Sequence, residues 1–223
     1  IAWDNAPKRV SEESLHGRDC YASLDLSSSD DMTAVCYCFP DDRKHFFDFI
    51  WRYFVPEERI RENAQAGGKY DVWVRDGFLI PTPGDVIDHE FILEQFDVDA
   101  QKFRIREVAY DRWGAVQVSL KIKERGLEVV PFGQGFRDMS PPTKDMHTYI
   151  KSGRIRHGGN PIAKWNVNNA VASFDPAGNV KLDKFKSKNK IDGIIAGVMA
   201  LDRAQRATPR PRNPYTERGI LSF

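Results

Sequence analysis

Short apolar runs separated by polar turns dominate the first third of the chain. These runs cover residues 21–26, 33–39 and 45–54, and the stretches SSSDD and PDDRK lie between them. Apolar runs bounded by Ser, Asp and Pro are typical of consecutive antiparallel hairpins. A polar helix is predicted over residues 56–66. The stretch VWVRDGFLI, at residues 72–80, predicts another short hairpin that turns at Asp76 and Gly77.

From residue 88 onward the pattern alternates between helical and strand-like periodicity. Strands are predicted at 104–111 (RIREVAYD) and 127–132 (LEVVPF), and a hairpin at 170–182 that turns at DPAGN. Helices are predicted at 88–101, 115–125, 143–151 (opened by two prolines), 161–169 and from about residue 191. Antiparallel hairpins followed by strand–helix alternation predict an α/β fold, with a mixed sheet flanked by helices.

Composition adds limits to this picture. The 223 residues are 41% apolar and 29% charged, which suits one large soluble domain. No apolar run approaches the roughly 18 residues of a membrane span, so no membrane partner is expected. Residues 1–17 are predicted to form a polar linker or arm, 18–207 the domain, and 208–223 a Pro/Arg-rich flexible tail.

Charge is distributed unevenly along the chain. Residues 1–100 hold 10 Lys and Arg against 21 Asp and Glu, whereas residues 101–223 hold 23 against 11. This asymmetry indicates a basic surface that could meet a polyanion. Lys184, Lys186, Lys188 and Lys190 form a strip of possible phosphate contacts, and Arg154 and Arg156 form a second, smaller cluster.

Three aspartates stand where a strand end or helix start could aim them at one crevice. Asp25 lies in the first strand, Asp111 closes REVAYD, and Asp192 opens the last apolar helix. Ligands of open α/β sheets usually bind at the carboxyl ends of the strands. Converging carboxylates need a cation, and oxygen ligands suit Mg²⁺ or Mn²⁺, two of which could serve phosphodiester hydrolysis.

A structural explanation competes for each of these acids. A strand-terminal or helix-starting Asp more often caps or turns the chain than catalyses, and Asp192 could simply complement a helix dipole. Asp25 is harder to explain in this way, because Asp is disfavoured inside strands. Asp30 and Asp31 are turn residues that could reach the site as auxiliary ligands, and Asp99 is expected to be solvated.

Other kinds of chemistry have weaker support in the sequence. The five His lack zinc-protease spacing, and the three Cys lack a partner pair and are predicted to be buried thiols. FGQGF lacks the third glycine of a dinucleotide loop, which favours a turn. GxxxxGK[ST] is absent, so the sequence contains no P-loop ATPase motif.

Four segments together resemble the C-terminal nuclease domain of tailed-bacteriophage terminase large subunits of the HK97-like type. They are SLDLSSSDDMTAVCYCF, VAYDRWGA, VVPFGQGFRDMSPPTKDMHTYIKSGRIRHGGNP and KNKIDGIIAGVMALDRA, in family order from about residue 21 to 206. The resemblance implies an RNase H-like fold. It also implies that Asp25, Asp111 and Asp192 are the catalytic metal ligands, which agrees with the choice made from the pattern.

The function implied by this resemblance is metal-dependent cleavage of concatemeric viral DNA during genome packaging, in the cytoplasm of an infected bacterium. The expected cofactors are two Mg²⁺ or Mn²⁺ ions. The expected partners are double-stranded DNA, which Arg112 and the lysine strip would contact, and the portal, small terminase subunit and capsid. The family's N-terminal ATPase is absent from this chain. A non-catalytic DNA-docking module and an actin-like ATP-binding domain remain as alternatives.

Overall fold

The computed structural model describes residues 2–5, 10–26, 32–41, 43 and 45–206 of the chain. Its centre is a mixed sheet in the order β4-β3-β2-β1-β5-β6, with β7 paired to β3, and β8 and β9 form a separate hairpin. The strands are β1 (Asp19–Asp25), β2 (Thr33–Pro40), β3 (Phe47–Pro56), β4 (Ile80–Thr82), β5 (Arg104–Asp111), β6 (Val129–Phe132), β7 (Ile155–Arg156), β8 (Ala172–Phe174) and β9 (Val180–Leu182).

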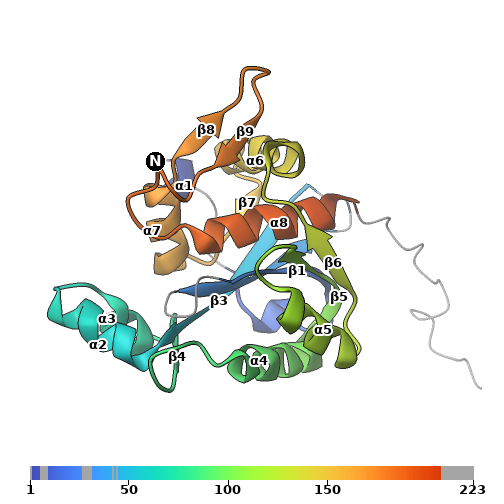
Figure 1. Cartoon of the computed structure of the whole chain (residues 1–223). Coiled ribbons are helices and arrows are strands. Elements are labelled where there is room, and N and C mark those ends of the chain that lie inside the picture. Colours follow the sequence, from blue (N-terminus) through green and yellow to red (C-terminus); the bar gives the residue numbers. More distant parts are fainter. Residues whose placement is uncertain (1, 6–9, 27–31, 42, 44, 207–223) are drawn as a thin grey trace, which may run out of the picture.

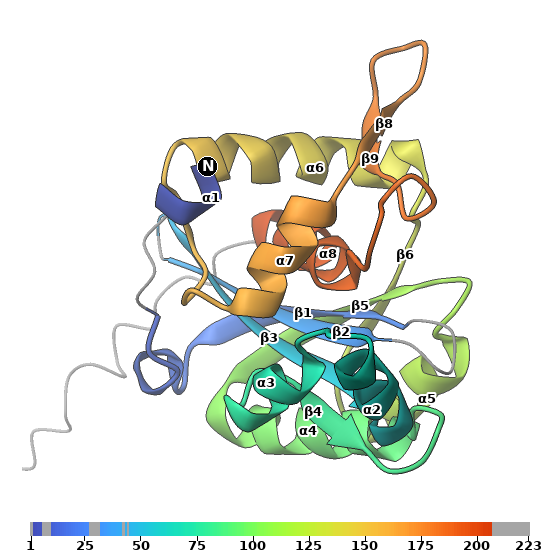
Figure 2. The same ribbon diagram turned by 90° about the vertical axis from the view of Figure 1, so that its left-hand side faces the viewer.

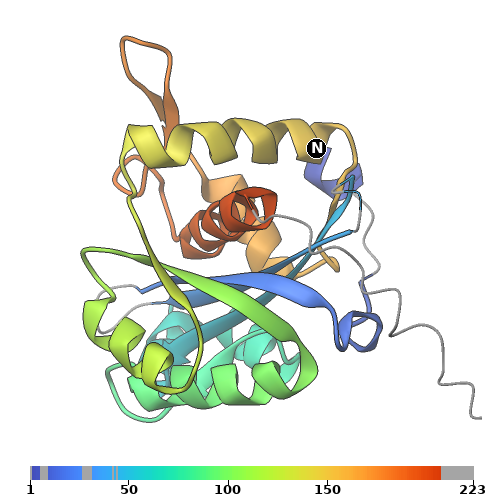
Figure 3. The same cartoon turned by 90° about the vertical axis from the view of Figure 1, so that its right-hand side faces the viewer.

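Helices cover both faces of the sheet, as the α/β prediction requires. Figures 1 and 3 show α4 and α5 on one face and α8 on the other, with α6 stacked beyond α8. The helical segments are α1 (Ala2–Asn5), η1 (Glu13–Leu15), α2 (Glu57–Gln65), α3 (Tyr70–Arg75), α4 (His89–Lys102), α5 (Val116–Glu124), α6 (Phe136–Lys151), α7 (Pro161–Asn169) and α8 (Asp192–Arg206). None of the helices in the described part of the chain is long and apolar enough to cross a membrane.

The two-residue period of β1 decides which side chains face α8. Cys20, Ala22 and Leu24 belong to the core beneath α4 and α5. The intervening positions face the other way, and the Ser23 hydroxyl donates a hydrogen bond of 2.5 Å to the Ala196 carbonyl of α8. Because alternate strand residues share a face, Asp25 at the end of β1 also faces α8.

The predicted hairpin over residues 72–80 is wrong. Residues 70–75 form α3, and β4 pairs with β3 in parallel. Tyr70 and Trp73 are three positions apart, so both lie on one helix face, where their rings stack at 5.6 Å. Trp165 of α7 packs on Trp73 at 5.4 Å. The chain does turn at Asp76 and Gly77, where Gly77 has a φ of 78°, but this turn ends α3 and does not join two strands. Burial of the aromatic cluster favours a helix before the turn.

Helix α6 begins seven residues earlier than the sequence predicts. It starts at Phe136, after Gly135, and contains Pro141 and Pro142 instead of beginning with them. Two prolines remove two backbone hydrogen bonds. The helix continues through them because Met139, Pro142 and Met146 are buried.

Asp99 is buried and ion-paired, so its predicted solvation is wrong. It is 0% exposed in α4, and Arg52 of β3 donates two hydrogen bonds to it, at 2.8 and 3.0 Å. The same guanidinium also pairs with Glu12 at 2.9 Å. A buried carboxylate is retained when a planar fork of donors satisfies both of its oxygens.

The predicted arm and the cysteines are also placed by the structure. Trp3 of α1 is buried and stacks on the His157 ring at 4.1 Å, and Leu15 of η1 is buried. The described part of residues 1–17 is therefore packed against the domain. The tail from residue 208 lies outside the described residues.

All three cysteines are free and buried, as predicted, and burial raises the pKa of Cys36 well above its ordinary value.

Candidate active site

The three predicted aspartates lie at the same end of the sheet. Asp25 ends β1 and Asp111 ends β5, and these strands are parallel neighbours in which Leu24 pairs with Tyr110. The next register step places Asp25 beside Asp111. Asp192 is the first residue of α8, which packs across β1, β2 and β5. The fold thus brings residues from three distant segments together.

Asp25 and Asp192 share one cation, the ammonium of Lys184. Lys184 Nζ lies 2.7 Å from Asp25 Oδ2 and 2.9 Å from Asp192 Oδ1. The two carboxylate side chains are 1% and 6% exposed, whereas that of Lys184 is 37% exposed. Figure 2 shows the segment between β9 and α8, which carries Lys184, above the end of β1. Two nearly buried acids are therefore paired with one lysine that reaches in from the surface.

Gln134 completes the contacts of Asp25. Its Nε2 donates a hydrogen bond of 2.9 Å to Asp25 Oδ1. Gln134 precedes α6, between Gly133 and Gly135, in the FGQGF stretch that the sequence suggests is a turn. A Cβ at Gly133 would displace the ends of the Arg112 and Asp138 side chains, which form an ion pair at 3.0 Å. The turn therefore places the Gln134 amide as a hydrogen-bond donor to the buried Asp25 carboxylate.

Burial raises the pKa of Asp25 to about 6. Lys184 opposes this shift, Asp192 adds to it by charge repulsion, and the hydrogen bonds from Lys184 and Gln134 oppose it. Burial alone would lower the pKa of Lys184, but the charges of Asp25 and Asp192 raise it above its ordinary range. Burial also raises the pKa of Tyr70 to about 12, and Asp192 contributes to that rise. The site therefore has an excess of negative charge in a poorly solvated place.

The raised pKa of Asp25 predicts a pH dependence of stability in the metal-free protein. Between the ordinary value of 3.8 and about 6, the folded state holds this proton more tightly than the unfolded chain. The contribution of Asp25 to the free energy of unfolding therefore falls as pH rises through this window. We compare the free energy of unfolding of wild type with that of Asp25→Asn. Wild type minus variant should be larger at pH 4.5 than at pH 7.5, by on the order of 2 kcal/mol. Denaturant unfolding in EDTA at the two pH values measures this difference in the free energy of unfolding. A difference that does not change with pH would refute the prediction.

Asp111 lies at the site but does not touch the other two acids. Its side chain is partly exposed, and its Oδ1 accepts a hydrogen bond of 3.2 Å from the Trp113 backbone N–H. Within the described ranges, no three His, Cys, Asp or Glu side chains are grouped closely enough to hold a metal ion. Asp111 therefore has the local turn contact expected of an Asp at a strand end, and it also lies at the same end of the sheet as Asp25 and Asp192.

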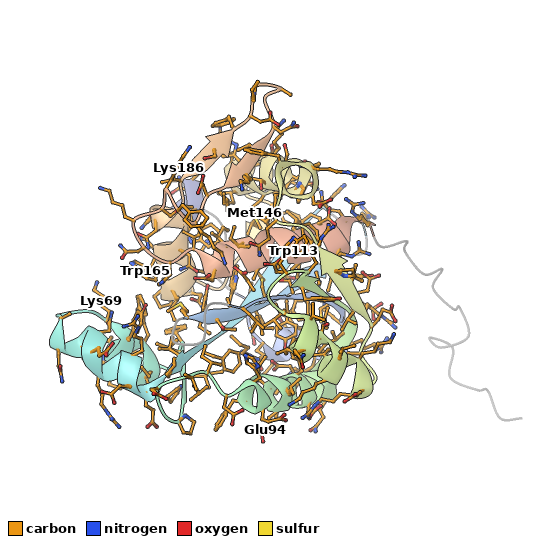
Figure 4. The ribbon with its side chains drawn as sticks, viewed as in Figure 1. Lys69, Glu94, Trp113, Met146, Trp165 and Lys186 are labelled. Atoms are coloured by element: carbon orange, nitrogen blue, oxygen red, sulfur yellow. The ribbon has the colours of Figure 1, made fainter. Side chains whose placement is uncertain are left out.

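The residues predicted to contact phosphate lie in different surroundings. Lys186 and Lys188 are exposed between β9 and α8, and Figure 4 labels Lys186 there and Trp113 in the turn after β5. Lys190 is partly buried, and its carbonyl accepts hydrogen bonds from the side chains of Asn166 and Asn169. Arg112 is next to Asp111 but pairs at 3.0 Å with Asp138 of α6. Lys184, in contrast, points into the acidic site.

Arg154 and Arg156 do not join the site. β7 pairs with the first residues of β3, which lie at the opposite end of the sheet from Asp25. Arg156 pairs with Asp48 at 2.5 Å, and Arg154 lies over the Tyr149 ring at 4.1 Å. The proposed auxiliary ligands Asp30 and Asp31 lie outside the described residues.

Sequence reasoning missed the roles of Gln134 and Lys184. A polar side chain between two glycines was the available signal for Gln134, since both glycines allow close backbone approach. Lys184 was grouped with its neighbouring lysines as a surface cation. Its inward direction depends on the loop conformation, which no periodicity in the sequence reveals.

A mixed sheet with acids at the ends of two adjacent parallel strands, and a third acid starting the helix packed across them, defines an RNase H-like domain. Residues 2–208 match the sequence model of the family described as terminase large subunit, endonuclease domain. The chain belongs to this family, which confirms the resemblance and the fold class expected from the sequence.

Two curated relatives extend the comparison. The chain is 36% identical over 192 residues to the terminase large subunit of Enterobacteria phage HK97, covering 84% of this chain and 38% of that protein. It is 29% identical over 215 residues to protein YmfN of Escherichia coli K12, covering 92% of this chain and 47% of YmfN. The chain thus spans less than half the length of either relative.

Solved structures agree with the fold. The crystal structure of the HK97 large terminase superposes with a TM-score of 0.82 at 33% identity, covering 91% of this chain and 42% of that one. The large terminase nuclease of thermophilic phage G20c superposes with a TM-score of 0.58 at 8% identity, covering 91% of this chain and 95% of that one. At that identity the second match shows the shared fold alone.

Proposed function

We propose that this chain is a divalent-metal-dependent endonuclease that cuts concatemeric viral DNA during genome packaging. One observation carries the proposal: two buried carboxylates from different elements, Asp25 and Asp192, face each other across a cation. Family membership makes a packaging nuclease the expected setting for such a site. The setting is the cytoplasm of an infected bacterium, and portal, small terminase subunit and capsid are the proposed protein partners.

The donor set fits Mg²⁺ or Mn²⁺. Asp25, Asp111 and Asp192 offer only carboxylate oxygens, which hard cations prefer, and an ammonium already occupies a cation position between two of them. Two such ions, when bound, would activate a water and stabilise the leaving oxygen of a phosphodiester. Structures of the G20c nuclease contain bound magnesium or cobalt, which supports a divalent ion in this fold.

Each residue has a distinct part in this proposal. Asp25, the most buried acid, serves as the central ligand, and Gln134 fixes its carboxylate through the bond to Oδ1. Asp111 and Asp192 complete the ligand set from either side. Polar atoms that are already oriented by the fold need no rearrangement during the reaction, which is the main source of electrostatic catalysis.

Contact with DNA is proposed for Arg112, which follows Asp111 in the chain, and for Lys186, Lys188 and Lys190, which precede Asp192. These cations would bind backbone phosphates, and phosphate contacts carry no base information, so the cleavage is expected to have low sequence specificity. The same contacts should make binding depend strongly on salt.

We expect Lys186→Ala with Lys188→Ala to weaken DNA binding and to reduce its salt dependence. Each lost phosphate contact lowers the slope of log K against log salt by about 1, so the double variant should lose about 2. Fluorescence anisotropy at several salt concentrations measures the slope. Lys151→Ala is the matched control, because Lys151 is exposed at the end of α6, the end far from β6 (Figure 2). Equal slopes for the double variant and wild type would contradict the proposed DNA surface.

A non-catalytic DNA-docking module is the alternative that one observation favours. Asp111 accepts a hydrogen bond from the Trp113 backbone N–H in the turn that follows it, so this acid also has a purely structural explanation. An actin-like ATP-binding domain gains no support from the family match.

Plasmid cleavage separates these possibilities. Supercoiled plasmid is incubated with the chain and Mn²⁺, Mg²⁺ or EDTA, and nicked and linear products are quantified. The nuclease proposal predicts products only with a divalent ion. Binding of the plasmid without cutting under all conditions would instead favour the docking module.

A further inference from the structure

The Lys184 ammonium stands where a metal ion would have to bind. It contacts one oxygen of Asp25 and one of Asp192, and Gln134 donates to the other Asp25 oxygen. Both oxygens of the central carboxylate therefore already face N–H donors. A metal ion that used Asp25 and Asp192 together could not bind until this lysine had moved.

Lys184 is directed into the site by its loop. Asp183 Oδ1 accepts hydrogen bonds from the backbone N–H groups of Phe185 and Lys186, at 3.0 and 3.2 Å. The other oxygen of Asp183 accepts from the Ser173 hydroxyl of β8 at 2.7 Å. The Asp183 carbonyl accepts from the Ser187 hydroxyl, also at 2.7 Å. Next to Lys184, Phe185 projects fully into solvent. The turn is thus anchored on both sides of Lys184.

Electrostatics explains why a cation is needed there. Two carboxylates that share one poorly solvated space repel each other, and a bound cation removes this cost. Lys184 neutralises them with its own charge, at the expense of desolvating one ammonium. Its side chain is still 37% exposed, so the ammonium can swing out to water without opening the core.

We propose that Lys184 is an internal counter-ion that holds Asp25 and Asp192 together in the metal-free protein, and that a divalent ion displaces it. This inference rests on the proposed metal-dependent function. Once released, the ammonium lies at the edge of the site beside Lys186 and Lys188, where a DNA phosphate can take the place of the carboxylates. Loading of metal and binding of DNA are then positively coupled, because each favours the outward position of one side chain.

The variant Lys184→Met tests this inference, because it keeps the length of the stem and removes the charge. We expect Mn²⁺ to bind the variant at least about tenfold more tightly than wild type, since the ion no longer competes with an ammonium. Isothermal titration calorimetry without DNA measures the affinity. Lys186→Met, in the same turn but exposed, is the control and should bind Mn²⁺ like wild type.

Thermal unfolding gives a second readout that does not depend on activity. In EDTA, Lys184→Met should melt below wild type, because two facing carboxylates lose their counter-ion. Saturating Mn²⁺ should then raise its melting temperature by more than it raises that of wild type. Lys184→Arg keeps a cation in place and should resemble wild type in both measurements.

The outcomes distinguish this inference from the proposed function. If wild type binds Mn²⁺ and cuts DNA but Lys184→Met binds Mn²⁺ equally or more weakly, displacement is wrong and the nuclease proposal stands. Lower cutting by Lys184→Met at unchanged Mn²⁺ affinity would assign Lys184 to DNA or to the reacting phosphate and also overturn displacement. If wild type neither binds Mn²⁺ nor cuts, the proposed function fails and this inference fails with it.

Discussion

Replacing Asp25 with Asn is expected to reduce DNA cleavage by about 1000-fold or more. The carboxylate is 0% exposed, is held by Gln134 and Lys184, and is the proposed central metal ligand. An amide carries no charge, so the site loses its main anionic ligand, and a bound metal contributes several kcal/mol of transition-state stabilisation. Initial rates of plasmid nicking in Mn²⁺ measure the effect.

The fold of Asp25→Asn should survive, which makes the result interpretable. Asn has the same shape, can still accept the Gln134 hydrogen bond, and removes the repulsion with Asp192. Circular dichroism and the melting temperature should remain close to wild type. Cleavage within about tenfold of wild type by a folded variant would show that Asp25 is not the central ligand.

Gly193→Ala is expected to destabilise the protein by about 2 kcal/mol and to reduce cleavage by about 100-fold. A Cβ at position 193 would overlap the Tyr53 hydroxyl and the Asn166 side-chain oxygen, and both residues are fully buried. Asn166 also accepts the Gly193 N–H at 2.9 Å, which fixes the start of α8. Moving this turn moves Asp192, the preceding residue. Denaturant unfolding and nicking rates measure the two effects.

Gly197→Ala is the matched control on the same helix. A Cβ there would lie 3.5 Å from Met146 and 3.6 Å from Trp51, which is ordinary contact. Alanine favours helix over glycine, so this variant should be unchanged or up to about 1 kcal/mol more stable. If Gly193→Ala behaves like Gly197→Ala, close packing at the start of α8 does not position Asp192.

Much of this site could be predicted from sequence because local rules act there. Strand periodicity and an acid beside Leu24 were enough to single out Asp25, and the structure places it at the strand end, facing α8. Asp192 was found because an acid opens an apolar helix, which folding buries on nearly every side. Likewise α7 was predicted with its observed bounds, because Asn160 and Pro161 form a strong helix start.

The rest depended on contacts between distant segments. Asp99 looks like surface charge until Arg52, 47 positions away, is brought beside it. An Asp-Gly pair follows α3 and ends it with a turn, and the packing of the segment before that turn against Trp165 explains why it is a helix and not a strand. Lys184 resembles the other lysines of its loop in sequence, and its burial partners come from β1 and α8.

The most direct test of the metal site is anomalous diffraction from crystals soaked in Mn²⁺. The proposal predicts anomalous peaks in contact with the carboxylates of Asp25, Asp111 and Asp192, with the Lys184 ammonium moved away from them. A fully soaked crystal without manganese at these three aspartates, or with manganese only elsewhere, would contradict the site.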